Sequence, residues 1–146
     1  MNFKFSGNFQ VLKNRETVYG LLTDPRKFAP LFPNLQYLEI HNDREFTVQV
    51  KVGLGFIKSK ATIRLALSGE QPHSHATYKG SGSVAGEPIA VTAAFDLEEK
   101  GGQTQVNWVG ESSLNMKLPA AAANLLEPVA RQSIKVLVDS IKTALA

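Results

Sequence analysis

The stretch FTVQVKVGLGFIKSKATIRLAL, residues 46–67, decides the fold class. Apolar residues occupy every second position in 46–52 and again in 61–67, and polar residues fill most of the positions between them. A period of two is typical of a strand with one buried and one solvent-facing side. The glycines at 53 and 55 interrupt the pattern and predict a turn. The stretch therefore predicts two antiparallel strands joined by a short connection.

The same alternation continues on both sides of this hairpin. It marks residues 2–12, 78–84, 89–97 and 106–108, and Gly7 is a candidate for a β-bulge in the first of these segments. Turns are predicted at 85–88 and at 100–102, where glycine and proline gather. Together the segments predict an antiparallel meander of about seven strands.

Helical signals stand at two places. Asn14 offers an N-cap for a short helix, and the dipeptide Asp24-Pro25 starts a second one, which prolines 30 and 33 end. A long helix is predicted from Pro119 to about Leu145, with a kink near 124–128 because Pro128 removes a helical hydrogen bond. One curved antiparallel sheet around one long helix is an α+β fold, and a cavity is expected between the two layers.

Composition sets limits on the class of protein. With 146 residues, 43% hydrophobic and 20% charged, the chain should form one globular domain over residues 1–146. It has no cysteine, which excludes disulfides and thiolate chemistry. Its N-terminus lacks the apolar core of a signal peptide, so we expect a cytoplasmic protein. The net charge of +3 comes from scattered basic residues, and we expect no nucleic-acid partner.

Residues 80–85 match the G-x-G-x-x-A fingerprint of dinucleotide-binding proteins. That fingerprint needs a helix after it, because the helix N-terminus holds the pyrophosphate. Alternation in 89–97 predicts a strand there instead, and Pro88 precedes it. We therefore interpret the match as coincidental.

Catalytic and metal-binding patterns are weak. His73 and His75 have the spacing of two metal ligands on one strand face, but a third ligand is not apparent, and we expect a turn and a strand start there. Glu98 and Glu99 are consecutive, so on a strand they face opposite ways and cannot work as an acid and base pair. We predict no catalytic and no metal-binding residues.

Four stretches carry a resemblance to a known family: FSGNF (5–9), NRETVYGLLTDPRKFAPLFPNLQYLE (14–39), VQVKVGLGFIKSKATIRL (48–65) and EPVARQSIKVLVDSIKTAL (127–145). With these the chain resembles the START-like, helix-grip (SRPBCC) superfamily, and within it the CoxG-like family, which is named for a subunit of carbon monoxide dehydrogenase. Residues 31–34 read LFPN where many relatives have Cys-x-Pro-Gly. The resemblance implies a START-like ligand-binding domain whose cavity holds an apolar molecule, with quinones among the ligands, in the service of carbon monoxide dehydrogenase and related molybdenum hydroxylases.

Ten residues are candidates to line that cavity. Two readings stay open for the aromatic ones, which either contact ligand or form ordinary core. The segment from 28 to 32 is either a gate, which could touch a membrane, or a plug. The glycines at 80 and 82 either permit a bend of the sheet or leave space above it, in which case Gly82→Leu would block the cavity without unfolding the protein. The candidates are Phe28, Leu31, Phe32, Phe56, Tyr78, Gly80, Gly82, Phe95, Trp108 and Leu126.

Two functional hypotheses follow. The first is a noncatalytic carrier of a quinone or lipid-like molecule, without a covalent cofactor, that also contacts a carbon monoxide dehydrogenase-like complex or the inner face of the membrane, or helps to mature a larger oxidoreductase. The second is a cyclase- or dehydratase-like enzyme that uses the same cavity. The enzyme would need inward-facing polar groups, for which Arg131, Tyr78 and Asn124 are the candidates, although Arg131 is expected on the solvent side of its helix.

Overall fold

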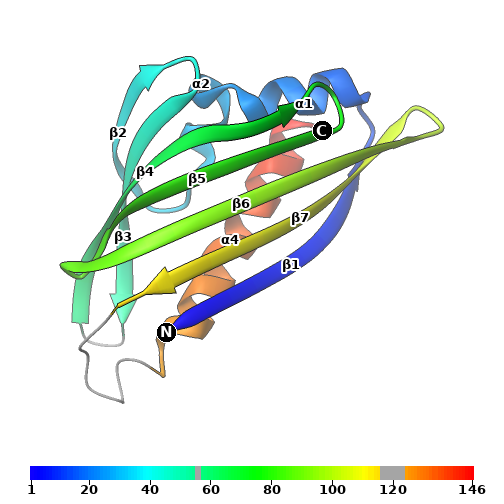
Figure 1. The fold of residues 1–146 in the computed structure, drawn as a ribbon. Coiled ribbons are helices and arrows are strands. Elements are labelled where there is room, and N and C mark those ends of the chain that lie inside the picture. Colours follow the sequence, from blue (N-terminus) through cyan, green and yellow to red (C-terminus); the bar gives the residue numbers. More distant parts are fainter. Residues whose placement is uncertain (55–56, 116–123) are drawn as a thin grey trace.

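An antiparallel sheet that curves around one long helix is the main feature of the computed structural model, which describes residues 1–54, 57–115 and 124–146 (Figure 1). The seven strands of the described chain follow the order β1-β7-β6-β5-β4-β3-β2, so β1 and β2 are the edges of an open sheet. This confirms the α+β class and the predicted meander. The strands are β1 (Asn2–Val11), β2 (Leu35–Asn42), β3 (Glu45–Leu54), β4 (Ile57–Gln71), β5 (His75–Val84), β6 (Glu87–Lys100) and β7 (Gln103–Leu114).

Short helices follow β1, as the capping residues predict. The side chain of Asn14 accepts a hydrogen bond from the Thr17 amide at 2.8 Å and caps α1 (Arg15–Thr23). Asp24 ends α1 and caps α2 (Pro25–Phe28) in the same way, and the single turn η1 (Ala29–Leu31) completes the segment. Phe32 then leaves the helical conformation, and Pro33 follows it. These helices cover one end of the sheet (Figure 1).

Two hairpin turns have the conformation that a tight connection requires. Ala85 and Gly86, between β5 and β6, have φ values of 52° and 80°, and Gly101 and Gly102, between β6 and β7, have 60° and 84°. Two consecutive left-handed residues form the turn that matches the right-handed twist of an antiparallel pair. The predicted hairpins are confirmed, and the coincidental reading of the G-x-G-x-x-A match is correct because β6, a strand, follows it. The predicted turn at 53–55 extends outside the described residues.

Helix α4 (Leu126–Ala144) forms the second layer. Pro128 lies in its first turn, where a backbone N–H has no intrahelical partner, so the proline costs no hydrogen bond. The predicted kink at 124–128 is therefore wrong, because Asn124 and Leu125 form a turn before the helix begins. The predicted helix start at Pro119 lies outside the described residues.

Strand β1 pairs with β7 over its full length. The register is continuous from Asn2 opposite Ser113 to Val11 opposite Thr104, and it places Gly7 opposite Trp108. The predicted β-bulge at Gly7 is wrong. A side chain at Gly7 would instead meet the indole of Trp108, with a Cβ only 2.7 Å from a ring carbon, so this glycine makes room for the tryptophan.

The buried apolar residues form two separate clusters on the concave side of the sheet. The larger cluster lies under α1, α2 and the C-terminal end of α4, where Ile141 and the capping residue Leu145 join it. The smaller cluster holds Ala61, Val84, Leu114 and Leu126, and Val129 packs against it. Helix α4 is thus attached to the sheet near each of its ends by a different cluster.

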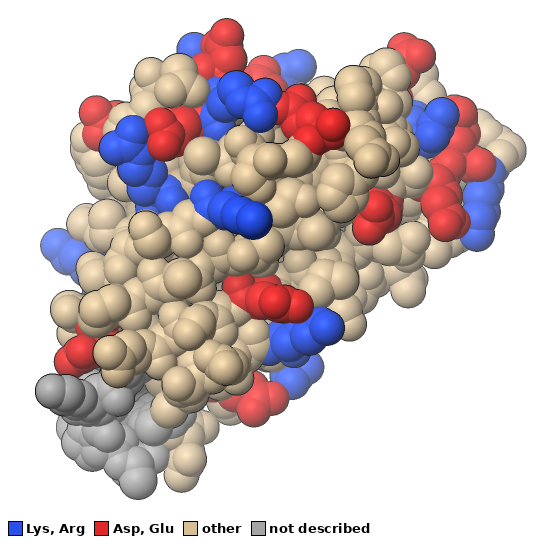
Figure 2. All heavy atoms as spheres, viewed as in Figure 1, with Lys and Arg blue, Asp and Glu red and all other residues tan. Residues whose placement is uncertain are grey.

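The face of the molecule in Figure 2 carries basic and acidic side chains side by side, gathered toward the ends of the sheet. It shows no continuous stripe of one sign of the kind that tracks a nucleic-acid backbone. The absence of a nucleic-acid partner stays a prediction.

Candidate functional site

Four of the ten candidate cavity residues belong to one packed aromatic cluster. The ring of Phe28 stacks on Tyr78 with centroids 5.3 Å apart and meets Phe32 and Phe95 edge-on at 5.4 and 5.9 Å. Phe46, which the sequence did not single out, contacts the same rings. Such edge and stacked contacts are those of an aromatic core. Leu31 packs against this cluster, and its segment resembles a plug more than an open gate.

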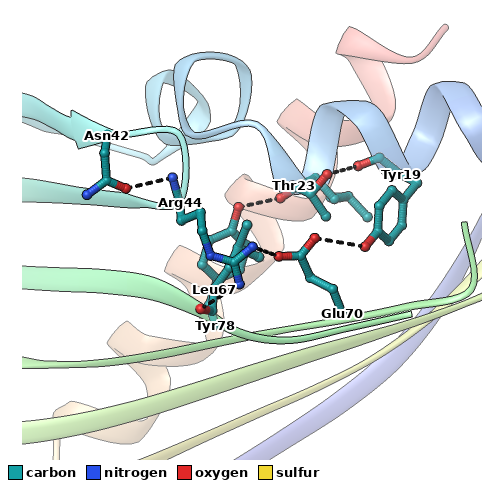
Figure 3. Close-up of polar contacts among 8 residues, drawn as sticks. Tyr19, Thr23, Asn42, Arg44, Leu67, Glu70 and Tyr78 are labelled. Atoms are coloured by element: carbon teal, nitrogen blue, oxygen red, sulfur yellow. Dashed lines mark hydrogen bonds and ion pairs between the residues drawn. The ribbon is translucent and has the colours of Figure 1, made fainter. Parts of the chain in front are cut away.

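Tyr78 has a fixed partner within the protein. Its side chain is fully buried, and its hydroxyl donates a hydrogen bond of 2.6 Å to the carbonyl of Leu22 at the end of α1 (Figure 3). Burial raises the pKa of the phenol above its usual range, so it stays neutral. The residue faces inward as predicted, and its polar atom holds α1 on the sheet.

A second polar network lies beside it and ties α1 to the far end of β4 (Figure 3). The hydroxyl of Tyr19 donates to Glu70 at 3.4 Å, and Arg44 pairs with the same carboxylate while donating to the Leu67 carbonyl at 3.2 Å. Burial, and then the Glu70 carboxylate, raise the pKa of Tyr19. Each group in this network is bound to another part of the protein, which favours a structural role.

The glycines at 80 and 82 permit a close approach of two strands. A Cβ at Gly80 would lie 2.2 Å from the carbonyl oxygen of Arg64, and one at Gly82 would lie 1.8 Å from that of Thr62, both on β4. Backbone atoms cannot yield such space cheaply. The geometry therefore favours the bend of the sheet, and the expectation that leucine at 82 would leave the fold stable is wrong.

Open space lies elsewhere on the concave face, between the two clusters. A Cβ added at Gly110, whose neighbours across the strands are Phe5 and Ala93, would meet no atom within 4 Å. Val91 and Ala93 on β6 are only partly buried there. On the helix, Ile134 is likewise partly exposed.

A groove of about 320 Å³ opens between the edge strand β1 and α4, beside Phe5, the cross-strand neighbour of Gly110. Its volume is at the lower end of the range for small-molecule sites. It lies where α4 spans the distance between the larger and the smaller cluster, so neither cluster fills it. The groove is lined by Phe5, Ser6, Gly7, Asn8, Trp108, Arg131, Ile134, Lys135 and Val138.

Trp108 is the one candidate among the nine described ones that lines this groove. Its indole lies over Gly7, and Nε1 is on the side of the ring that faces this glycine. Within the described ranges 1–54, 57–115 and 124–146, this N–H makes no hydrogen bond to the protein. A partly exposed indole with a free donor can hold an apolar molecule and also orient a polar group on it.

Basic side chains of α4 stand at the rim of the groove. The Arg131 guanidinium lies 5.0 Å above the ring of Phe5 and donates a 2.8 Å hydrogen bond to Glu127. The side chain is solvent-exposed, as predicted, yet it also borders the groove. Lys135, one helical turn further on, lines the groove as well. Asn124 is exposed in the turn before α4, and Tyr78 is in the core, so the three polar candidates for catalysis do not line the groove together.

The histidine and glutamate candidates lie outside this groove. His73 is in the β4–β5 turn and packs edge-on against Tyr19, and His75 starts β5, as predicted. His75 is hydrogen-bonded to Asp96 at 2.8 Å and to Thr77 at 2.9 Å on the convex side of the sheet. No group of three possible metal ligands occurs among the residues whose positions are described.

Several groove residues escaped sequence reasoning. Phe5 and Gly7 alternate visibly in β1, but only the pairing of β1 with β7, about a hundred residues away, shows that they lie beside Trp108. Ile134 and Val138 carried a signal in the helical spacing, although that spacing cannot separate positions over the open gap from positions over a cluster. Phe56 was a candidate and lies outside the described residues. Leu126 is buried in the smaller cluster.

Comparison with solved structures identifies the fold. The fold is the START-like helix-grip fold. A conserved protein from Geobacillus kaustophilus superposes with a TM-score of 0.82 at 18% identity, covering 99% of this chain and 95% of its own. The Zhui aromatase/cyclase of Streptomyces sp. R1128 gives 0.74 at 14% identity, with 99% and 94% covered. A START superfamily protein from Mycobacterium smegmatis gives 0.71 at 11%, with 97% and 96% covered.

The family follows from the sequence. The model of CoxG, a subunit of carbon monoxide dehydrogenase, matches residues 7–146, and the chain belongs to the CoxG family. No curated protein matches the sequence significantly. In the described part of the chain, no helix is both long and apolar enough to span a bilayer.

Proposed function

We propose that this protein is a noncatalytic carrier that binds a hydrophobic small molecule, such as a quinone or a single-chain lipid, between α4 and the concave face of the sheet. The observation that carries the proposal is the groove between β1 and α4, which lies beside two clusters that pack tightly without closing it. The family and the fold of the chain support the same reading.

Desolvation would supply the affinity. At about 25 cal/mol per Å², burying about 300 Å² of apolar ligand surface is worth about 7 kcal/mol before the costs of association. Trp108 and Phe5 would cover one side of the ligand, and Ile134 and Val138 of the helix would cover the other. Binding of this kind needs no reactive group.

A substitution beside the groove tests the proposal. Gly110→Leu would place a side chain in open space next to its cross-strand neighbour Phe5, which lines the groove, and Gly110→Ala is the matched control because a methyl group there meets nothing within 4 Å. We expect the leucine variant to stay folded and to lose binding of a short-chain ubiquinone analogue and of dodecanol, measured by native mass spectrometry after delipidation. Equal binding by the leucine and alanine variants, or no binding by the unchanged protein, would contradict the proposal.

The enzyme hypothesis remains a second candidate because the Zhui aromatase/cyclase has the same fold. The groove residues of the described chain are apolar, amide, hydroxyl and basic groups, and they include no carboxylate or imidazole to act as a base at neutral pH. Turnover of a polyketide-like substrate by the protein, with loss of turnover in Arg131→Gln, would favour the enzyme over the carrier.

We also propose that the carrier serves a carbon monoxide dehydrogenase-type molybdenum hydroxylase in the cytoplasm, in electron transfer through its ligand or in assembly of the complex, and that it meets the membrane only peripherally. The support for this is membership of the family. Co-purification of the protein with such an enzyme from the native cell, and fractionation of the cell into soluble and membrane parts, test the two statements separately.

A further inference from the structure

The groove pairs an apolar wall with a basic rim. Ile134 and Val138 are four residues apart on α4, and so are Arg131 and Lys135, so each pair lies along one line of the helix surface. Both lines border the groove. A ligand lying along α4 would therefore meet hydrophobic side chains and positive charge over the same length.

The positive charge at the rim is only partly neutralised. Glu127 takes one hydrogen bond from Nη2 of Arg131 and leaves the other guanidinium donors free of that contact. Lys135 makes no ion pair among residues 1–54, 57–115 and 124–146. Two like charges one helical turn apart repel each other, and an anion between them would remove that repulsion.

We propose that the physiological ligand is a single-chain amphipathic anion, of the fatty-acid type, whose acidic group binds Arg131 and Lys135. Its chain lies against Trp108, Phe5 and Ile134. The groove of about 320 Å³ suits one chain and not two. The inference rests on the proposed function and narrows its ligand class, because a neutral quinone would leave Lys135 without a counter-charge and Arg131 with Glu127 alone. A fatty-acid-type anion carries no electrons, so it is compatible with the assembly role and not with electron transfer through the ligand.

Trp108 makes the test direct. It is the only tryptophan of the chain, so intrinsic tryptophan fluorescence reports on the groove alone. The delipidated protein is titrated with dodecanoate and with dodecanol, which share the chain and differ in charge, below the concentrations at which they aggregate. We expect dodecanoate to bind at least about tenfold more tightly, since hydrogen bonds to an ionised group are the strong ones. Added salt should weaken dodecanoate and leave dodecanol unchanged.

Substitutions on α4 test whether Arg131 and Lys135 bind the acidic group. Arg131→Gln combined with Lys135→Gln should lose the preference for dodecanoate and keep the affinity for dodecanol. Lys142→Gln is the matched control, because Lys142 is an exposed lysine of the same helix that does not line the groove. Should the double variant melt early in circular dichroism, Lys135→Gln alone decides the question, since this side chain makes no ion pair with the described protein.

The outcomes separate the inference from the proposed function. Equal affinity for dodecanoate and dodecanol, or a preference that survives both substitutions, would overturn the anionic ligand and leave the apolar carrier standing. Absence of binding of both compounds would overturn the inference, and it would overturn the carrier as well if the ubiquinone analogue also fails to bind. A preference abolished by the double variant and retained by Lys142→Gln supports the inference.

Discussion

At the scale of the single residue, Tyr78 makes both an aromatic contact and a buried hydrogen bond. Its ring joins the aromatic cluster beside Phe28, and its hydroxyl donates to the Leu22 carbonyl. The sequence predicted that it faces inward, and it left open whether the hydroxyl meets a ligand. In the structure the hydroxyl donates to the protein itself, at the end of α1. Burial raises the pKa of the phenol and so keeps it protonated.

We predict that Tyr78→Phe lowers the free energy of unfolding by about 1–3 kcal/mol near neutral pH, because the Leu22 carbonyl loses its buried donor. The difference should shrink as pH rises above about 10, the pKa of a tyrosine in the unfolded chain. Above this pH the tyrosine of the unfolded chain ionises while the buried one stays protonated, so the unmodified protein loses stability as pH rises. The phenylalanine variant has no phenol at this position and does not lose this stability.

Urea unfolding at neutral and at alkaline pH measures this effect. Tyr37→Phe is the control, because Tyr37 is exposed on β2 and its hydroxyl bonds only to Glu39 among the described residues. A difference between the protein and Tyr78→Phe that stays constant across the alkaline range would refute the link between burial and pKa.

At the scale of the element, glycines allow strand β5 to pack close to β4. At residues 80 and 82, backbone carbonyl oxygens of β4 occupy the space that a Cβ atom would need. The alternation of apolar residues predicted the strand, and it could not show how close a neighbouring strand comes.

Gly82→Ala should therefore destabilise the protein by about 1–3 kcal/mol or more, as overpacking does. Gly110→Ala is the same substitution on β7, where the added methyl group meets no atom within 4 Å. It should be neutral or stabilising by up to about 1 kcal/mol, since alanine loses less backbone entropy on folding than glycine does. Thermal melts of both variants measure the contrast. Similar melting temperatures for the two would mean that β5 can move away from β4 without cost.

Helix α4 shows how a local rule depends on where an element begins. Pro128 predicted a kink on the assumption of a helix from Pro119, whereas the described helix begins at Leu126 and holds the proline in its first turn. Proline does disrupt the interior of a helix, but Pro128 is not in the interior of the described helix. Sequence periodicity does not fix helix ends closely enough to show this.

Across the whole molecule, stability should be divided unevenly between the two clusters. The larger cluster combines α1, α2, concave side chains from most of the strands and the end of α4, while the smaller one holds four buried residues. The groove lies between them, so the small end is joined to the large one chiefly through the sheet.

Hydrogen exchange along β6 should follow this division. The strand has hydrogen-bonded neighbours on both sides, so its amides differ mainly in the core beneath them. We predict slow exchange at Phe95 and Leu97, over the larger cluster, and faster exchange toward Ile89 and Val91. Uniform protection along the strand would mean that the two ends unfold as one unit.

The sequence by itself determined the meander, the capped helices after β1, the amphipathic final helix and the family. These follow from periods of two and 3.6 residues, from caps and from turn glycines, all of which act over a few residues. Only the tertiary structure decided where the concave face stays open. That depends on the register of β1 with β7 and on the two clusters that hold α4, which are contacts between residues far apart in the chain. The candidate site is therefore the groove beside Trp108 rather than the aromatic cluster, and Trp108 is the one described residue of the ten cavity candidates that lines it.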